Sequence, residues 1–291
     1  MKTSIFSLPN GTMTFHEAVD YVKQLGVDAI EPYNRSEFQT PSVENAKKLR
    51  DYAAEQGVGI SCFSMMGNLA LKDQKAEIER LKGFIDTAAA MGSPYFHHTL
   101  IPGLTFGGDG RSFKEYLNYV VPAARELYDY AEQQGVKCCY EDQGFVFNGV
   151  HRFDDLLGEM ERPVGVVADL GNILFVGDTP EAFVARFASR ICHVHVKDYL
   201  SKDARWSNPG QGWYVTRDGG FLRGTIVGHG VVCFERVFTI LNDAGYDGYF
   251  SLECDCMEEI FKAQKLSIEN MRRFYRMAQV SGQKAIDVSL N

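Results

Sequence analysis

The sequence of 291 residues lacks a long hydrophobic run. A helix needs about 18 or more consecutive apolar residues to span a bilayer, and no stretch of the sequence reaches that length. The first residues, Met1 to Phe6, lead into an apolar segment that is too short for a signal peptide and has no cleavage site after it. We therefore expect a cytoplasmic protein without a membrane partner.

Positive charge is also scarce. The chain has 30 lysine and arginine residues against 38 aspartate and glutamate residues, and its formal net charge is −8. Proteins that bind a phosphate backbone usually present a basic face, so this balance argues against nucleic acid as a partner. The hydrophobic content of 45% is typical of a globular protein with a sizeable core.

Paired cysteines and a phosphate-binding loop are missing as well. The seven cysteines are odd in number and lie mostly in apolar, strand-like runs, which indicates reduced, buried thiols. Cys254 and Cys256 have no second pair at zinc-site spacing, so they do not predict a thiolate metal site. No Gly-x-x-x-x-Gly-Lys motif is present, which leaves open whether the substrate is phosphorylated.

Short strand-like runs alternate with longer amphipathic stretches eight times along the chain. Such near-continuous apolar runs are typical of parallel strands that are covered on both sides. The predicted strands are Thr3–Ser7, Asp28–Pro32, Val58–Ser64, Tyr95–Thr99, Val136–Glu141, Val164–Asp169, Ile191–Val196 and Gly248–Glu253. This pattern predicts the α/β class and one (β/α)₈ TIM barrel over residues 1–291.

Helix start and stop signals support the alternation. Thr14 and Glu17 have capping-box spacing, and glycines end helices just before strands, as Gly57 and Gly135 do. A segment of about residues 197–230, rich in Gly, Asp and Arg, follows the seventh strand. We expect it to be a lid-like loop at the C-terminal face, where the active sites of such barrels lie.

Acidic or imidazole side chains stand at the ends of four strands: Glu141, Asp169, His195 and Glu253. Such groups are costly at the mouth of an apolar barrel unless they are paired or bind a cation. Three carboxylates and one imidazole suit Mn²⁺, Mg²⁺ or Co²⁺ better than a structural zinc ion. His193 lies on the same side of its strand as His195, farther from the mouth, and is expected to be a hydrogen-bonded core residue.

Four stretches carry a resemblance to a known family. They are Glu141 at its strand end, Val167-Ala168-Asp169-Leu170-Gly171-Asn172, His193-Val194-His195-Val196-Lys197-Asp198 and Gly245-Tyr246-Asp247-Gly248-Tyr249-Phe250-Ser251-Leu252-Glu253. In these, the chain resembles the sugar phosphate isomerase/epimerase superfamily with the xylose-isomerase-like TIM barrel. Gly228-His229-Gly230 is similar to that family's Gly-Glu-Gly turn, with His in place of Glu. The resemblance implies that Glu141, Asp169, His195 and Glu253 hold one divalent metal ion, Mn²⁺ first, with Mg²⁺, Co²⁺ or Zn²⁺ as alternatives. It also implies a homodimer or homotetramer.

Branches of the superfamily differ at nearby positions. Ketose 3-epimerases carry His, Arg and Glu where this chain has Asn172, Ser201 and Phe147. His-Val-Lys-Asp resembles the inositol-catabolism branch, whose reactions include dehydration. The endonuclease IV branch needs further histidines, one of them at the Asn172 position.

The resemblance implies a metal-dependent isomerase or epimerase that acts on a small sugar or keto-sugar through an enediolate. Glu141 and Glu253, on different strands, would be its base and acid. The alternative on the same site is a lyase or dehydratase that acts on a keto-inositol or a 3-keto-glycoside. A non-catalytic sugar-binding subunit and an endonuclease IV-like DNA repair enzyme are the remaining readings.

Five further residues are candidates for substrate binding. Glu31 ends the second strand and is expected to bind a substrate hydroxyl or to form a structural ion pair. Lys197 is expected to pair with substrate or with a carboxylate such as Asp198 or Glu253. Asn172, His229 and His97 are the other three candidates. The resemblance to the family's Phe-His pattern favours His97 over His98 as the histidine that faces the site.

Overall fold

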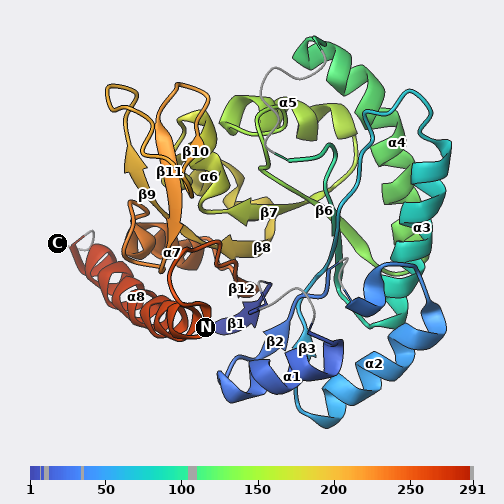
Figure 1. Ribbon diagram of the computed structural model, residues 1–291, viewed down its shortest axis with the longest axis horizontal. Coiled ribbons are helices and arrows are strands. Elements are labelled where there is room, and N and C mark those ends of the chain that lie inside the picture. The colour runs from blue at the N-terminus through green and yellow to red at the C-terminus, as the bar shows by residue number, and fades with distance from the viewer. Residues whose placement is uncertain (7, 10–12, 34–35, 104–109, 289–291) are drawn as a thin grey trace.

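The computed structural model describes residues 1–6, 8–9, 13–33, 36–103 and 110–288 (Figure 1). Within these residues the strands of one parallel sheet follow the order β3-β2-β1-β12-β8-β7-β6-β5-β4. The strands are β1 (Lys2–Ile5), β2 (Ala29–Ile30), β3 (Gly59–Ile60), β4 (Phe63–Met65), β5 (Tyr95–His98), β6 (Lys137–Glu141), β7 (Gly165–Asp169), β8 (Ile191–Val196) and β12 (Tyr249–Leu252). Each lies within, or one residue beyond, a predicted strand.

The two ends of this order come from one run of chain, and that closes the barrel. The predicted strand Val58–Ser64 is split: β3 pairs with β2, and β4 pairs with β5. The sheet therefore closes as a barrel with eight strand positions, and the two short strands β3 and β4 together fill one of them. The predicted TIM barrel is confirmed.

Helices surround the strands on the outside (Figure 1). They are α1 (Phe15–Gln24), α2 (Val43–Glu55), α3 (Lys75–Ala90), α4 (Phe113–Gln133), α5 (Val150–Met160), α6 (Pro180–Phe187), α7 (Phe234–Asp243) and α8 (Ile260–Val288), with short 3-10 turns at Ser36–Phe38, Asn172–Val176 and Ala188–Arg190. Thr14 and Glu17 form the predicted capping box of α1. Within the described part of the chain, no helix is long and apolar enough to cross a membrane.

The segment after β8 differs from the predicted loop. It contains β9 (Asp198–Lys202), β10 (Tyr214–Val215) and β11 (Phe221–Thr225), which form an antiparallel sheet in the order β10-β11-β9 beside the barrel (Figure 1). Tyr199 of β9 and Leu222 of β11 are buried in a small apolar cluster with Phe145 and Phe175. The predicted loop therefore contains strands that the sequence did not indicate, because these apolar side chains pack against residues of other βα connections. That the segment acts as a lid remains a prediction.

The main apolar core lies between the strands and the helices, whereas the inside of the barrel combines polar groups with a small apolar cluster of Cys62, Cys139 and Val167. Val166 and Ala168 of β7 belong to the main apolar cluster. Asp169, which ends the same strand, is buried near the mouth. Lower in the barrel, the hydroxyl oxygens of Ser4 and Ser61 are 2.6 Å apart and buried. Because polar groups line part of this interior, charged groups at the mouth have hydrogen-bonding partners below them.

Candidate metal centre

Four strand-end side chains meet at the mouth of the barrel. Glu141 ends β6, Asp169 ends β7, His195 lies near the end of β8 and Glu253 follows β12, and these four strands are neighbours in the sheet. One ligand atom from each lies within 4.8 Å of the others. The Nδ1 atom of His195 is 2.6 Å from Glu141 Oε1, 3.5 Å from Glu253 Oε2 and 3.8 Å from Asp169 Oδ2. The structure thus brings together the group that the sequence predicted.

A lysine ammonium bridges two of these carboxylates. Lys197 Nζ lies 2.8 Å from Asp169 Oδ2 and 3.0 Å from Glu253 Oε2, and the lysine is only 5% exposed. Gly171 makes room for it, because a Cβ atom at that position would lie 2.6 Å from Lys197 Cγ. Lys197 therefore pairs with Asp169 and Glu253, two of the predicted metal ligands, and this is one of the alternatives that the sequence left open.

Burial and neighbouring charges shift the pKa values of these groups in opposite directions. Burial raises the pKa of Glu141 to about 8, although the charge on His195 opposes the rise. Burial also raises the pKa of Glu253, in spite of the ammonium of Lys197. For Asp169, Lys197 and His195 together outweigh the effect of burial and lower the pKa. A cluster of carboxylates with unequal proton affinities results.

The donor set fits a divalent cation. Carboxylate oxygens with one imidazole nitrogen are ligands that Mg²⁺ and Mn²⁺ accept. Asp169 Oδ1 accepts hydrogen bonds of 2.8 Å from the backbone N–H groups of Gly171 and Asn172, which fixes the carboxylate with Oδ2 toward His195. Asp142 Oδ1 in turn accepts a 2.8 Å bond from the Asp169 N–H. Asp142 was not predicted as a site residue, and the one feature of the sequence that could have pointed to it is its position directly after Glu141.

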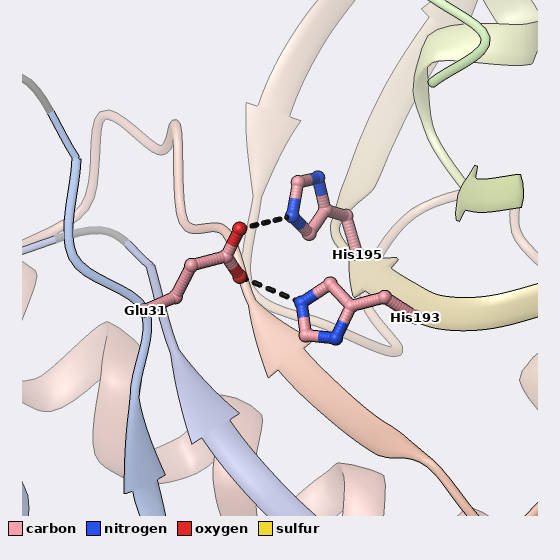
Figure 2. A group of neighbouring side chains, drawn as sticks. All are labelled: Glu31, His193 and His195. Carbon is pink, nitrogen blue, oxygen red and sulfur yellow. Dashed lines mark hydrogen bonds and ion pairs between the residues drawn. The ribbon is translucent and has the colours of Figure 1, made fainter. Parts of the chain in front are cut away.

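Glu31 lies below the cluster and pairs with both histidines of β8 (Figure 2). Its Oε2 atom is 2.7 Å from His193 Nε2, and its Oε1 atom is 3.0 Å from His195 Nε2. Burial alone would raise the pKa of Glu31, but the charges of His195 and His193 hold it well below its ordinary value. The structure thus shows the ion pair that was one of the two alternatives for Glu31, and His193 is the buried, hydrogen-bonded core residue that was expected.

The two histidines of β5 point to opposite sides of the strand. His97 faces the site: its Nδ1 atom is 3.2 Å from Ser64 Oγ, and its Nε2 atom is 3.8 Å from Glu141 Oε2. The Nε2 atom of His98 instead lies 3.3 Å from the Tyr140 hydroxyl oxygen. That hydroxyl also donates a hydrogen bond to the backbone carbonyl of Ala124 in α4. The preference for His97 over His98 as the residue facing the site is therefore confirmed.

The burial of His98 predicts a loss of stability in acid. Burial lowers the pKa of His98 to about 4 from an ordinary value of 6.5. Between these two values the unfolded chain binds more protons than the folded one, so stability should fall as the pH falls. We expect His98 to account for about 3 kcal/mol of unfolding free energy lost between pH 7 and pH 4.

Urea denaturation at a series of pH values tests this expectation. In His98→Asn the dependence of the unfolding free energy on pH should be shallower over this range. His151→Asn, an exposed histidine, is the control and should follow the wild type. Equal slopes for the wild type and His98→Asn would show that His98 does not titrate with a lowered pKa.

The remaining candidates lie apart from the charged cluster or touch it through the backbone only. His229 is exposed, and within the described part of the chain its side chain forms no hydrogen bond or ion pair with the four strand-end groups. Asn172 is buried and donates its backbone N–H to Asp169. Asp198 faces away from Lys197: its Oδ2 atom accepts bonds of 2.9 and 2.7 Å from the N–H groups of Gly228 and Gly230. Asp198 therefore holds the Gly-His-Gly turn, and no Asp198–Lys197 ion pair is formed.

Comparison with known proteins places this barrel in a family. The family model described as xylose isomerase-like TIM barrel matches residues 19–277. The chain belongs to the xylose isomerase-like TIM barrel family.

The curated relatives share about a quarter to a third of their aligned residues with this chain. The inosose dehydratase of Bacillus thuringiensis (strain Al Hakam) is 33% identical over 218 residues, and inosose dehydratase 1 of Bacillus cereus is 24% identical over 220 residues. Each match covers 74% of this chain but only 63% of the relative, so the chain spans less than two thirds of these relatives' length.

Solved structures show the same fold. A D-tagatose 3-epimerase-like protein superposes with a TM-score of 0.74 at 18% identity, covering 97% of this chain and 99% of that one. A xylose isomerase-like TIM barrel protein from Mycobacterium smegmatis, solved in complex with magnesium, has a TM-score of 0.70 at 16% identity, covering 94% and 91%.

Proposed function

We propose that this protein is a metal-dependent enzyme that removes the proton next to the carbonyl group of a small keto-sugar or keto-cyclitol. The observation that carries the proposal is the largely buried group of three carboxylates, one imidazole and one ammonium at the mouth of the barrel, in which only Glu253 is partly exposed. The inosose dehydratase and D-tagatose 3-epimerase names of its relatives support a polyhydroxylated ketone as the substrate class.

Glu141, Asp169, His195 and Glu253 are the residues that would hold one divalent ion, Mn²⁺ or Mg²⁺. When bound, such an ion polarises the carbonyl oxygen and makes the neighbouring C–H group more acidic. The Mycobacterium smegmatis structure with magnesium supports a hard divalent ion in a barrel of this fold.

The proton transfers fall to Glu141 and Glu253. Their strands, β6 and β12, are separated by β7 and β8 in the sheet, so the two carboxylates enter the site from different directions. In an epimerisation, one carboxylate takes the proton from the carbon next to the carbonyl, and the other returns a proton to the opposite face of that carbon. In an isomerisation, one carboxylate carries the proton from one carbon to its neighbour. We place isomerase or epimerase activity first.

Dehydration is the second candidate, favoured by the inosose dehydratase relatives and by Lys197. It starts with the same proton abstraction, after which a hydroxyl on the next carbon leaves. The leaving hydroxyl needs a proton to depart as water. Lys197 Nζ, 3.0 Å from Glu253 Oε2, is a buried acid placed to supply it.

Deuterium exchange tests both candidates in one experiment. The Mn²⁺-loaded protein is incubated in D₂O with ketoses, aldoses and keto-inositols, and after removal of protein and metal each sample is examined by proton NMR. Deuterium beside the carbonyl together with a new sugar is expected for an epimerase or isomerase. Loss of that C–H signal together with a product one water lighter indicates the dehydratase.

Protein stripped of metal by a chelator is the control and should show neither result, and added Mn²⁺ should restore activity. If no substrate in the panel exchanges or reacts in protein shown to hold metal, the proposed proton abstraction is wrong for this class of substrate.

A further inference from the structure

A network of hydrogen bonds below the metal centre meets at one buried carboxylate. Glu31 Oε1 lies 2.5 Å from Ser64 Oγ and 3.0 Å from His195 Nε2, and its Oε2 atom lies 2.7 Å from His193 Nε2 (Figure 2). Glu31, Ser64 and both histidines are at most 2% exposed. Three side chains from β4 and β8 thus share a single acceptor group.

The chemistry of these groups fixes where their protons lie. A carboxylate has no hydrogen to give, so each partner must donate to it. His195 therefore carries a hydrogen on Nε2, and its other ring nitrogen, Nδ1, faces Glu141 and Asp169, where it would be the ligand atom for a metal ion. A hydrogen bond of this kind to the far nitrogen is how proteins orient a histidine ligand of a metal ion.

The same argument reaches His97 through the serine. The hydroxyl of Ser64 has one hydrogen, and its 2.5 Å contact with Glu31 uses that hydrogen. Ser64 Oγ can then only accept from His97 Nδ1, which is 3.2 Å away. In a neutral imidazole the other nitrogen, Nε2, keeps the lone pair. Among the described residues His97 Nε2 has no hydrogen-bond partner, although His97 is only 5% exposed.

We propose that Glu31 is a positioning residue that sets which nitrogen of His195 and of His97 faces the site, and that His97 Nε2 accepts a hydrogen bond from a hydroxyl group of the substrate. This hydroxyl lies beside Glu141, because Glu141 Oε2 is 3.8 Å from His97 Nε2. The part that concerns the substrate rests on the proposed function. The proposed contact requires a substrate with a hydroxyl group beside Glu141, and a deoxy analogue that lacks this hydroxyl would lose the hydrogen bond to His97 Nε2.

Nitrogen-15 NMR of the histidine side chains tests the proton positions without any substitution. In the Mg²⁺-loaded wild-type protein we expect the hydrogen of His97 on Nδ1 and that of His195 on Nε2. The opposite tautomer at His97 would overturn the inference, whatever the activity of the protein.

Three variants then separate the two branches of the network. Ser64→Ala should let His97 populate both tautomers and raise KM about 3- to 10-fold, the effect of one lost hydrogen bond, while Mg²⁺ affinity measured by calorimetry stays the same. Glu31→Met removes both acceptor oxygens at a similar side-chain length, and it should disturb both histidines and weaken Mg²⁺ binding roughly 10- to 100-fold. Ser61→Ala is the matched control, because Ser61 is an equally buried serine that bonds to Ser4 instead of Glu31.

The outcomes distinguish this inference from the proposed function. If Ser61→Ala shifts the His97 tautomer as much as Ser64→Ala does, the network does not set it and the inference fails. If the tautomers are as stated but no substrate exchanges deuterium, the positioning role of Glu31 stands and the proposed reaction falls. If the enzyme turns over a keto-sugar and Glu31→Met leaves both tautomers and Mg²⁺ affinity unchanged, the reaction stands and the role of Glu31 is wrong.

Discussion

Replacing Glu253 with glutamine is expected to lower kcat about 10²- to 10⁴-fold, the usual contribution of a positioned acid or base. The amide has nearly the shape of the carboxylate, but it cannot take up or release the proton of the substrate. Glu253 lies 3.0 Å from Lys197 and 3.5 Å from His195, so the substitution also removes a negative charge from a crowded cluster. Steady-state kinetics at saturating Mn²⁺ measure the effect and keep it apart from weaker metal binding.

Glu259→Gln is the matched control for this variant. It is the same change six residues farther along, at an exposed position where Glu259 accepts hydrogen bonds from the first backbone N–H groups of α8. Its kcat should equal that of the wild type. If Glu253→Gln retains full kcat in protein that holds metal, Glu253 is not the acid or base, and Glu141 or Lys197 must carry its proton transfer.

Replacing Asp198 with alanine is expected to destabilise the fold by about 4 kcal/mol. The carboxylate accepts backbone N–H groups on both oxygens: Gly228 and Gly230 on Oδ2, and Tyr199 and Val232 on Oδ1. Alanine removes the acceptor of all four donors. Two of them, the N–H groups of Tyr199 and Val232, are buried, and each buried donor left without a partner costs about 1 to 3 kcal/mol. The carboxylate packs closely against the turn, because a Cβ atom at Gly230 would lie 2.2 Å from Asp198 Oδ1.

Chemical denaturation of the wild type and variant measures this difference. Asp198→Asn should be almost as unstable as Asp198→Ala, because its amide nitrogen would face N–H groups with hydrogens of its own. Asp203→Asn, at an exposed aspartate of the same segment, should change stability by less than about 0.5 kcal/mol. A loss below about 1 kcal/mol for Asp198→Ala would mean that water replaces the carboxylate in the turn.

The barrel itself was predictable because its signals are local. The apolar runs at residues 136–141 and 164–169 became β6 and β7 with their acidic ends in place. Gly57 and Gly135 end helices with φ angles of 73° and 74°, which few other residues adopt. Two elements escaped prediction for the same reason. The split of residues 58–64 into β3 and β4, and the strands after β8, depend on partners from other parts of the chain.

The order of the barrel strands and helices, and the set of acidic and imidazole groups at the strand ends, could be read from the sequence. Hydrophobic periodicity and strand boundaries are properties of neighbouring residues, so they can be read along the chain. Which partners those groups take depends on the folded structure. Lys197 faces Asp169, while its neighbour Asp198 faces the turn at Gly228. Glu31 meets Ser64 across 33 residues and His195 across 164. Such pairings depend on the closure of the barrel, because that closure brings distant strand ends within hydrogen-bonding distance.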